Sequence, residues 1–125
     1  MRNELRLGCA VDAAMSVIEG KWKAVIICKL AHNGQMRFSE LMRGIPTISS
    51  KVLANQLKEL EEDGIIFRKS TIAAKRVTYS LTEKGYDLGP ALVELVKWSL
   101  RNTALKETSL NSTTCINFEL PPIKA

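Results

Sequence analysis

Residues 37–81 carry two short helical patterns followed by two short strand patterns, and this order constrains the fold more than any other feature of the sequence. The first helix is predicted by apolar residues that repeat at i, i+3, i+4 and i+7, namely Phe38, Leu41, Met42 and Ile45. Pro46 ends this helix because it disfavours helical geometry at the residue before it. Two short helices joined by a tight turn and followed by a hairpin predict a helix-turn-helix with a wing.

The second helix of this motif is predicted to follow Ser49, whose hydroxyl can accept a hydrogen bond from an otherwise unpaired backbone N–H. Its apolar stripe consists of Val52, Leu53, Leu57 and Leu60. The opposite face carries Ser50, Lys51, Ala54, Asn55 and Lys58, whereas the acids stand only at the far end, before Gly64. A recognition helix that inserts its first turns into a major groove needs this polarity. An ordinary amphipathic helix with a solvated face has the same pattern, so the helix alone does not decide between the two.

The hairpin that follows is basic. Residues 65–71 are rich in β-branched and aromatic side chains, and residues 76–81 alternate, so both are predicted strands. Between them, 72–75 carries no glycine or Asn-Gly turn signal, which predicts a longer or mobile loop at the tip. Residues 64–81 contain four basic residues and no acid: Arg68, Lys69, Lys75 and Arg76. A local basic hairpin beside a capped helix is typical of nucleic-acid binding, whereas the net charge of +5 alone is not.

The rest of the chain predicts further helices around this motif. Helical periodicity runs from Val11 to Gly20, from Lys21 to His32, and from a cap at Thr82 to about Arg101, with Gly89-Pro90 predicted to kink the last helix or set its true start. That helix has apolar surface left over for a partner chain, at Leu92, Leu95, Val96 and Leu100. The predicted fold is mainly α with a small β-hairpin (α+β). Residues 1–107 form a winged helix-turn-helix domain with terminal dimerisation helices, and the Ser/Thr/Asn-rich stretch in 108–125 predicts a flexible tail.

Composition excludes several classes of protein. No run of about 18 apolar residues predicts a membrane span, and the N-terminus lacks the apolar region of a signal peptide. Three cysteines without paired spacing suit a reducing compartment, so we expect a cytoplasmic protein. His32 is the only histidine, and the chain offers neither a Gly-rich phosphate loop nor ligands at metal spacing. We therefore expect no enzyme activity, no metal and no cofactor.

Many dispersed elements of the chain together resemble the HxlR family of winged helix-turn-helix transcriptional regulators. They are Cys9, Gly20-Lys21-Trp22-Lys23, Arg37-Phe38-Ser39-Glu40-Leu41, Ile48-Ser49, Leu53, Gln56-Leu57, Leu60-Glu61, Asp63-Gly64 and Tyr79-Ser80-Leu81-Thr82-Glu83-Lys84-Gly85. The resemblance covers roughly residues 9–99. It implies a bacterial or archaeal homodimer whose terminal helices form the dimer and whose recognition helix and wing contact an operator. Several members sense quinones, aldehydes or oxidants through the cysteine that matches Cys9.

The chain departs from the family pattern at three places. Ala10 follows Cys9 where proline is usual, Ala73-Ala74 stands where the wing usually has prolines, and the tail beyond about Asn102 matches nothing familiar. Cys9 is the redox- or electrophile-sensing candidate, because helix-end amides and nearby Arg6 favour the thiolate, although Asp12 opposes it. The alternative is a structural thiol that packs under the dimer interface. Cys28 is predicted to be structural, and Cys115 lies in the tail.

The sequence as a whole favours a sequence-specific transcriptional regulator that binds double-stranded DNA as a homodimer on a two-fold operator, with an unknown effector. Short polar groups on the first turns of the recognition helix, Ser50, Lys51 and Asn55, are expected to read base edges. Phosphate contacts are expected from Ser49, Lys58, Lys75 and Arg76, with Arg37 and Thr47 as further DNA-contact candidates. The alternatives are a nonspecific architectural DNA-binding protein and a protein-interaction module that has lost its DNA contacts.

Overall fold

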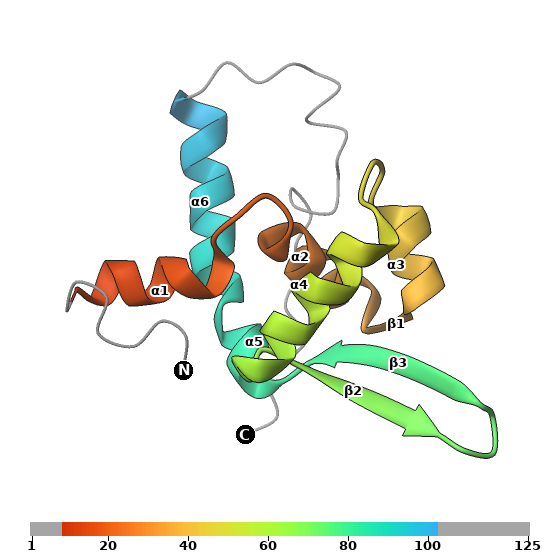
Figure 1. The fold of residues 1–125 in the computed structure, drawn as a ribbon. Coiled ribbons are helices and arrows are strands. Elements are labelled where there is room, and N and C mark those ends of the chain that lie inside the picture. The colour runs from red at the N-terminus through yellow and green to blue at the C-terminus, as the bar shows by residue number, and fades with distance from the viewer. Residues whose placement is uncertain (1–8, 103–125) are drawn as a thin grey trace.

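The computed structural model describes residues 9–102, and Figure 1 shows their arrangement. Six helices and three strands follow one another in this part of the chain: α1 (Ala10–Ile18), α2 (Lys23–Asn33), β1 (Gln35–Arg37), α3 (Phe38–Gly44), α4 (Ser50–Glu62), β2 (Ile66–Thr71), β3 (Arg76–Leu81), α5 (Glu83–Asp87) and α6 (Gly89–Asn102). The strands form one antiparallel sheet in the order β1-β3-β2. The predicted class, mainly helical with a small winged sheet, is confirmed. The predicted tail, 108–125, lies outside the described residues.

The core forms where α2, α3 and α4 meet the root of the sheet. Its most deeply buried side chains are aliphatic and come from all these elements: Ile26, Ile27, Leu30, Leu41, Leu53, Leu57, Leu60, Ile65 and Ile66. Burial of each contributes roughly 1.5–3 kcal/mol relative to exposure, so this cluster is the main source of stability. The helix predicted from Lys21 begins at Lys23 instead, and Trp22 is its half-buried N-cap residue.

Local capping explains the bounds of the two helices of the motif. The Glu40 side chain accepts a hydrogen bond from the backbone N–H of Arg37 (2.7 Å), which fixes the start of α3. The Ser49 hydroxyl accepts one from Val52 N–H (3.1 Å), as predicted for the start of α4. After α4, Gly64 adopts φ +77°, and its N–H and that of the next residue donate back into the last turn. This is the Schellman arrangement, which favours glycine at that position.

The tip of the wing has the bounds that the sequence predicts. β2 and β3 pair up to Thr71 and Arg76, which leaves only four residues, 72–75, in the connection. Lys75 adopts φ +49°, and its N–H donates to the carbonyl oxygen of Ile72 (3.1 Å). The connection is thus a four-residue turn without glycine or asparagine, in which Lys75 takes the left-handed conformation that those residues usually supply.

The last predicted helix is two helices. Thr82 caps α5 as expected, with its hydroxyl accepting from Gly85 N–H (3.0 Å), but α5 ends at Asp87 and α6 starts at Gly89. Pro90 sits in the first turn of α6, where its missing N–H is tolerated. Gly89-Pro90 therefore sets the true start of the terminal helix.

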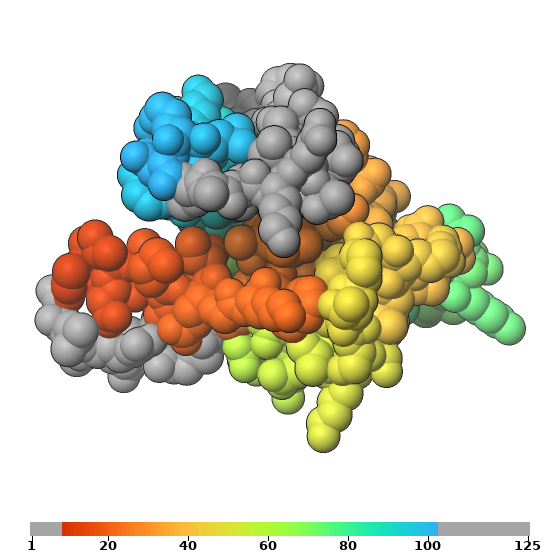
Figure 2. Space-filling model, turned by 90° about the horizontal axis from the view of Figure 1, so that it is seen from above, coloured from red at the N-terminus to blue at the C-terminus, as the bar shows by residue number. Residues whose placement is uncertain are grey.

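Helices α1 and α6 gather at the end of the molecule opposite the wing (Figures 1 and 2). Their exposed large apolar side chains are Val11, Met15, Leu95, Trp98 and Leu100. The prediction of Leu92 as an interface residue is wrong: Leu92 is only 5% exposed, because the first turn of α6 packs it into the core cluster of its own chain. In the described part of the chain, no helix has the length and apolarity that a membrane crossing requires.

Candidate nucleic-acid interface

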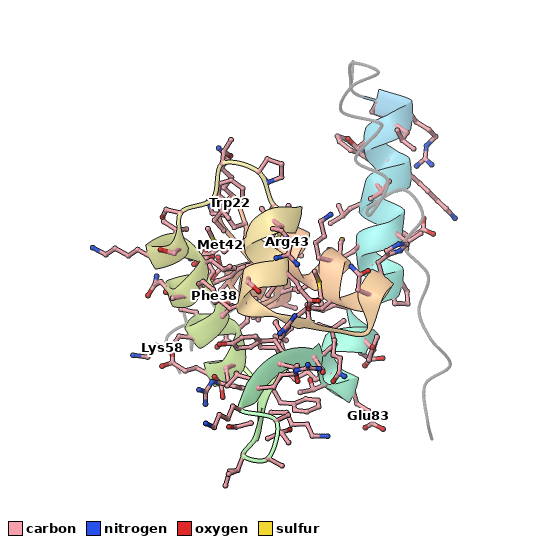
Figure 3. The ribbon with its side chains drawn as sticks, turned by 90° about the vertical axis from the view of Figure 1, so that its right-hand side faces the viewer. Trp22, Phe38, Met42, Arg43, Lys58 and Glu83 are labelled. Carbon is pink, nitrogen blue, oxygen red and sulfur yellow. The ribbon has the colours of Figure 1, made fainter. Side chains whose placement is uncertain are left out.

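Helix α4 separates its buried and exposed faces cleanly along most of its length. Leu53, Leu57 and Leu60 are buried, whereas the predicted contact residues Ser49, Ser50, Lys51, Asn55 and Lys58 are all exposed on the other side. In Figure 3, Lys58 projects from α4 away from the helical body. The predicted apolar stripe is wrong at Val52, which is 37% exposed. Val52 lies at the edge of the buried stripe of Leu53, Leu57 and Leu60, so its side chain is partly turned toward the exposed face.

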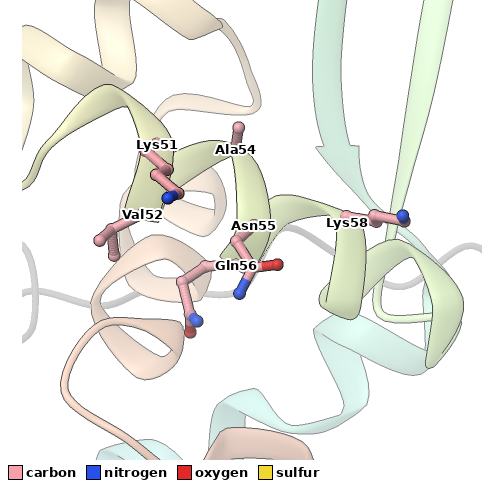
Figure 4. A pocket seen from close by; sticks show the side chains of 6 residues that line it. All are labelled: Lys51, Val52, Ala54, Asn55, Gln56 and Lys58. Carbon is pink, nitrogen blue, oxygen red and sulfur yellow. The ribbon is translucent and has the colours of Figure 1, made fainter.

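An open, shallow hollow lies along this exposed face. It is lined by Lys51, Val52, Ala54, Asn55, Gln56 and Lys58 (Figure 4). Sequence reasoning missed Val52 and Gln56, although their spacing of four residues places them beside the Lys51–Asn55 pair. An amide, a cation and a small apolar group on one surface offer three kinds of base-edge contact: adenine for Asn or Gln, guanine for Lys, and the thymine methyl for an apolar side chain.

The turn between α3 and α4 brings a further predicted residue to the surface. Thr47 is exposed and adopts φ +70°, a conformation that is uncommon for a β-branched residue. Arg37 lies at the start of α3, where its backbone is fixed by Glu40 while its guanidinium stays exposed. The Thr47 side chain is therefore available for DNA contacts beside the first turn of α4, and that of Arg37 for DNA contacts beside the sheet.

The wing supplies a separate basic element. Lys75 and Arg76 are exposed at its tip, at a distance along the sheet from α4. No residue of β2, β3 or the connection between them is acidic. A cation on such a surface binds phosphate without competition from a neighbouring carboxylate. Within residues 9–102, no group of three or more histidine, cysteine, aspartate or glutamate side chains could hold a metal ion.

Cys9 occupies the N-cap position of α1 and is exposed. Interaction with the backbone N–H of Asp12, and to a smaller extent that of Val11, lowers the pKa of the Cys9 thiol below its usual value. Cys28 is buried in the core cluster, as predicted for a structural thiol. Arg6 and Cys115 lie outside the described residues.

The comparisons with known proteins agree with this geometry. The HxlR-like helix-turn-helix family matches residues 17–107. The chain belongs to this family. It is thus a helix-turn-helix transcriptional regulator and not an enzyme, and the family implies DNA as its partner.

Similar proteins include HTH-type transcriptional regulators and the solved structures of two regulators, HypR and YodB. The chain is 49% identical over 89 residues to an uncharacterised HTH-type transcriptional regulator of Halalkalibacterium halodurans, covering 70% of this chain and 79% of the relative. Among solved structures, the reduced form of the redox regulator HypR is 37% identical with a TM-score of 0.70, covering 75% of this chain and 93% of that one. The reduced form of YodB, a transcriptional regulator from B. subtilis, is 34% identical with a TM-score of 0.68, covering 76% and 94%.

Proposed function

We propose that this HxlR-like regulator binds a two-fold operator as a homodimer in the cytoplasm, and reads its sequence through the first turns of α4. The observation that carries the proposal is the polarity of α4. Its exposed N-terminal half presents Ser50, Lys51 and Asn55, whereas its acids are confined to residues 59–62 at the other end. Residues 50–58 of α4 contain no acid and can approach phosphates without charge repulsion. Ser50, Lys51 and Asn55 are the readers, and Ser49, Lys58, Lys75 and Arg76 hold phosphates.

The homodimer is supported by the exposed apolar side chains of α1 and α6. Leu95 and Trp98 are 51% and 53% exposed, and Val11 and Met15 are exposed on the neighbouring helix. Exposed large apolar side chains on two helices at one end of the molecule are costly in water and favour an interaction site there. A two-fold pairing through this end leaves both α4 helices and both wings on the outside, where two half-sites can be bound about one DNA turn apart.

We also propose that oxidants or electrophiles regulate DNA binding through the Cys9 thiol. The exposed thiol at a helix N-terminus has a lowered pKa, which favours the reactive thiolate. HypR is described as a redox regulator, and the chain is similar to it. Because Cys9 stands at the start of α1, an adduct or an intersubunit disulfide there would alter the α1 end of the dimer, and with it the spacing of the two α4 helices.

Selection of bound duplexes from a random pool, with and without reductant, tests this function against a nonspecific architectural role. A recovered two-fold motif with half-sites about one turn apart is the expected result, and recovery of unrelated sequences contradicts it. The matched variants are Asn55→Ala and Lys75→Ala. Asn55→Ala should cost roughly 1–3 kcal/mol on the selected duplex and little on random DNA, whereas Lys75→Ala should weaken both duplexes about equally.

A further inference from the structure

The outer face of the three-stranded sheet carries a row of side chains that the contacts of α4 do not use. Strand register decides which residues share it, because successive side chains point to opposite faces. Met36, Ile66 and Leu81 are buried, so they mark the face that packs on the helices. The opposite face comprises Gln35, Arg37, Phe67, Lys69, Thr71, Arg76, Thr78 and Ser80, here named the outer sheet face.

The register aligns this face into cross-strand rows. Thr78 of β3 pairs with Arg37 on one side and with Lys69 on the other. The next row toward the tip pairs Arg76 with Thr71. Neighbouring strands are about 4.8 Å apart and successive rows about 6.8 Å apart, so three cations alternate with hydroxyl groups over a small area.

Nothing in the strands neutralises these cations. The three strands contain no acidic residue, and Arg37, Lys69 and Arg76 are all exposed. Phe67, in the row of Gln35 and Ser80, is also exposed. Cations, hydroxyl donors and one apolar ring suit a ligand that has anionic oxygens and apolar carbon together, which is the chemistry of a sugar–phosphate backbone.

The position of the face favours DNA over an acidic protein as the occupant. Its tip end, at Thr71 and Arg76, belongs to the wing, and Arg37, in its middle row, is the N-cap residue of α3. The face is therefore continuous with two elements of the winged helix-turn-helix, and DNA bound at the wing can continue along the sheet. An acidic peptide needs no such continuity.

We propose that the outer sheet face binds the phosphate backbone of duplex DNA that flanks the operator, outside the bases read by α4. This inference rests on the proposed function, since it places a flank beside a bound half-site. Arg37 and Lys69 bind phosphates on the two sides of Thr78, and Phe67 packs on deoxyribose. The flanks add affinity and salt dependence without adding sequence preference.

Two duplexes and two neighbouring variants test the proposal. One duplex ends at the half-sites selected for the wild-type protein, and the other extends it by one helical turn on each side with arbitrary sequence. Lys69→Gln removes a cation of the outer sheet face. Arg68→Gln is the matched control, because it removes the same charge from the adjacent residue of β2, whose side chain lies on the opposite face. Arg37→Gln is the second test variant, in β1.

The wild-type protein should bind the extended duplex more tightly and with a steeper salt dependence than the short one. Lys69→Gln should lower the salt slope on the extended duplex by about 0.9 per lost contact, hence about 1.8 for a dimer, and leave the short duplex unchanged. Arg37→Gln should also lower the salt slope on the extended duplex, and Arg68→Gln should leave the difference between the duplexes intact. An equal salt slope on both duplexes for the wild type, or the same loss in all three variants, would overturn the proposal. Failure to select any duplex would instead overturn the proposed function, and the inference with it.

Discussion

Lys23 and Glu59 form an ion pair between the first turn of α2 and the recognition helix, with the Nζ and Oε1 atoms 2.5 Å apart. The lysine side chain is 2% exposed, whereas the glutamate is 30% exposed. This asymmetry matters because a charge that loses its partner is expensive only where water cannot replace that partner. The pair joins the Gly20–Lys23 stretch, which the sequence singles out, to the helix proposed to read DNA.

The asymmetry predicts unequal costs for removing either partner. Glu59→Gln leaves a buried ammonium without its carboxylate and should lower the free energy of unfolding by about 3 kcal/mol, the low end for a broken buried pair. Lys23→Met removes the buried charge itself and leaves a carboxylate that water reaches, so its cost should be about 1 kcal/mol or less. Urea unfolding monitored by circular dichroism measures both. A larger loss in Lys23→Met than in Glu59→Gln would contradict this account.

Gly85 is fixed by a close backbone contact at the root of the wing. A Cβ atom at this position would lie 2.3 Å from the carbonyl oxygen of Ile65, and backbone cannot move aside as a side chain can. Gly85→Ala should therefore destabilise the protein by about 1–3 kcal/mol, as overpacking does. Gly44→Ala is the control, since a Cβ there meets only the flexible Lys29 side chain at 3.6 Å and alanine favours the helix. Equal thermal midpoints for the two variants would contradict the steric argument.

The features that could be predicted from sequence are those set by neighbours along the chain. The cap at Ser49, the stop at Gly64 and the start of α6 near Gly89 depend on local backbone chemistry, and all three agree with the structure. The features that could not be predicted depend on distant contacts. The burial of Leu92 in the core cluster and the close approach of Gly85 to Ile65 involve residues far apart in sequence, and helical periodicity carries no information about them.

The same distinction holds for the candidate interface. Periodicity placed Lys51, Asn55 and Lys58 on the exposed face of α4, but it assigned Val52 to the core, because an apolar residue next to a stripe fits either face. The outer sheet face required the pairing register, which unites β1 with residues about forty positions later. Arg37 was predicted as a contact residue, whereas its alignment with Lys69 across Thr78 was not.

Thr47 holds the left-handed conformation in the turn of the helix-turn-helix, which predicts that glycine is tolerated there. That conformation costs an L-residue roughly 1–2 kcal/mol, whereas glycine in its place adds about 0.5–1 kcal/mol of chain entropy. Thr47→Gly should therefore leave stability unchanged or raise it by up to about 1 kcal/mol. Thr71→Gly, in the regular strand β2, is the control and should lower it. Urea midpoints compare the two, and a loss at Thr47 as large as that at Thr71 would contradict the prediction.

If the proposed dimer forms through the exposed apolar side chains of α6, a charge introduced there should abolish it. Leu95→Asp or Trp98→Asp should give a folded monomer in sedimentation velocity, because a carboxylate in an apolar interface loses its hydration. Ile72→Asp is the control: Ile72 is 91% exposed at the wing tip, far from α1 and α6, so its substitution should leave the dimer intact. A dimer that survives the substitutions in α6 would remove this surface from the proposed interface.

The lowered pKa of the Cys9 thiol predicts that its alkylation rate rises at a lower pH in the folded protein than in the unfolded protein. The amides of Asp12 and Val11 stabilise the thiolate only while α1 is folded, so the midpoint of the iodoacetamide rate against pH should lie below that of the urea-unfolded protein. Because the pKa is lower in the folded state, the thiolate stabilises the fold above the unfolded-state pKa, and this contribution is lost as the pH falls through the folded-state pKa. Equal midpoints for folded and unfolded protein would show that the helix end does not activate the thiol.

If the Cys9 thiolate regulates DNA binding, diamide or a quinone should change the operator affinity of the wild-type protein but not that of Cys9→Ser. Serine keeps a small hydrogen-bonding side chain at the N-cap of α1 and cannot form a disulfide or a thiol adduct, so the fold is preserved while the chemistry is lost. Cys28→Ser is a poor control because Cys28 is buried in the core; Cys28→Ala avoids a buried hydroxyl and should retain the response. Fluorescence anisotropy on the selected duplex measures the affinities. An identical oxidant response in wild type and Cys9→Ser would exclude Cys9 and leave Cys115, outside the described residues, as the thiol to test.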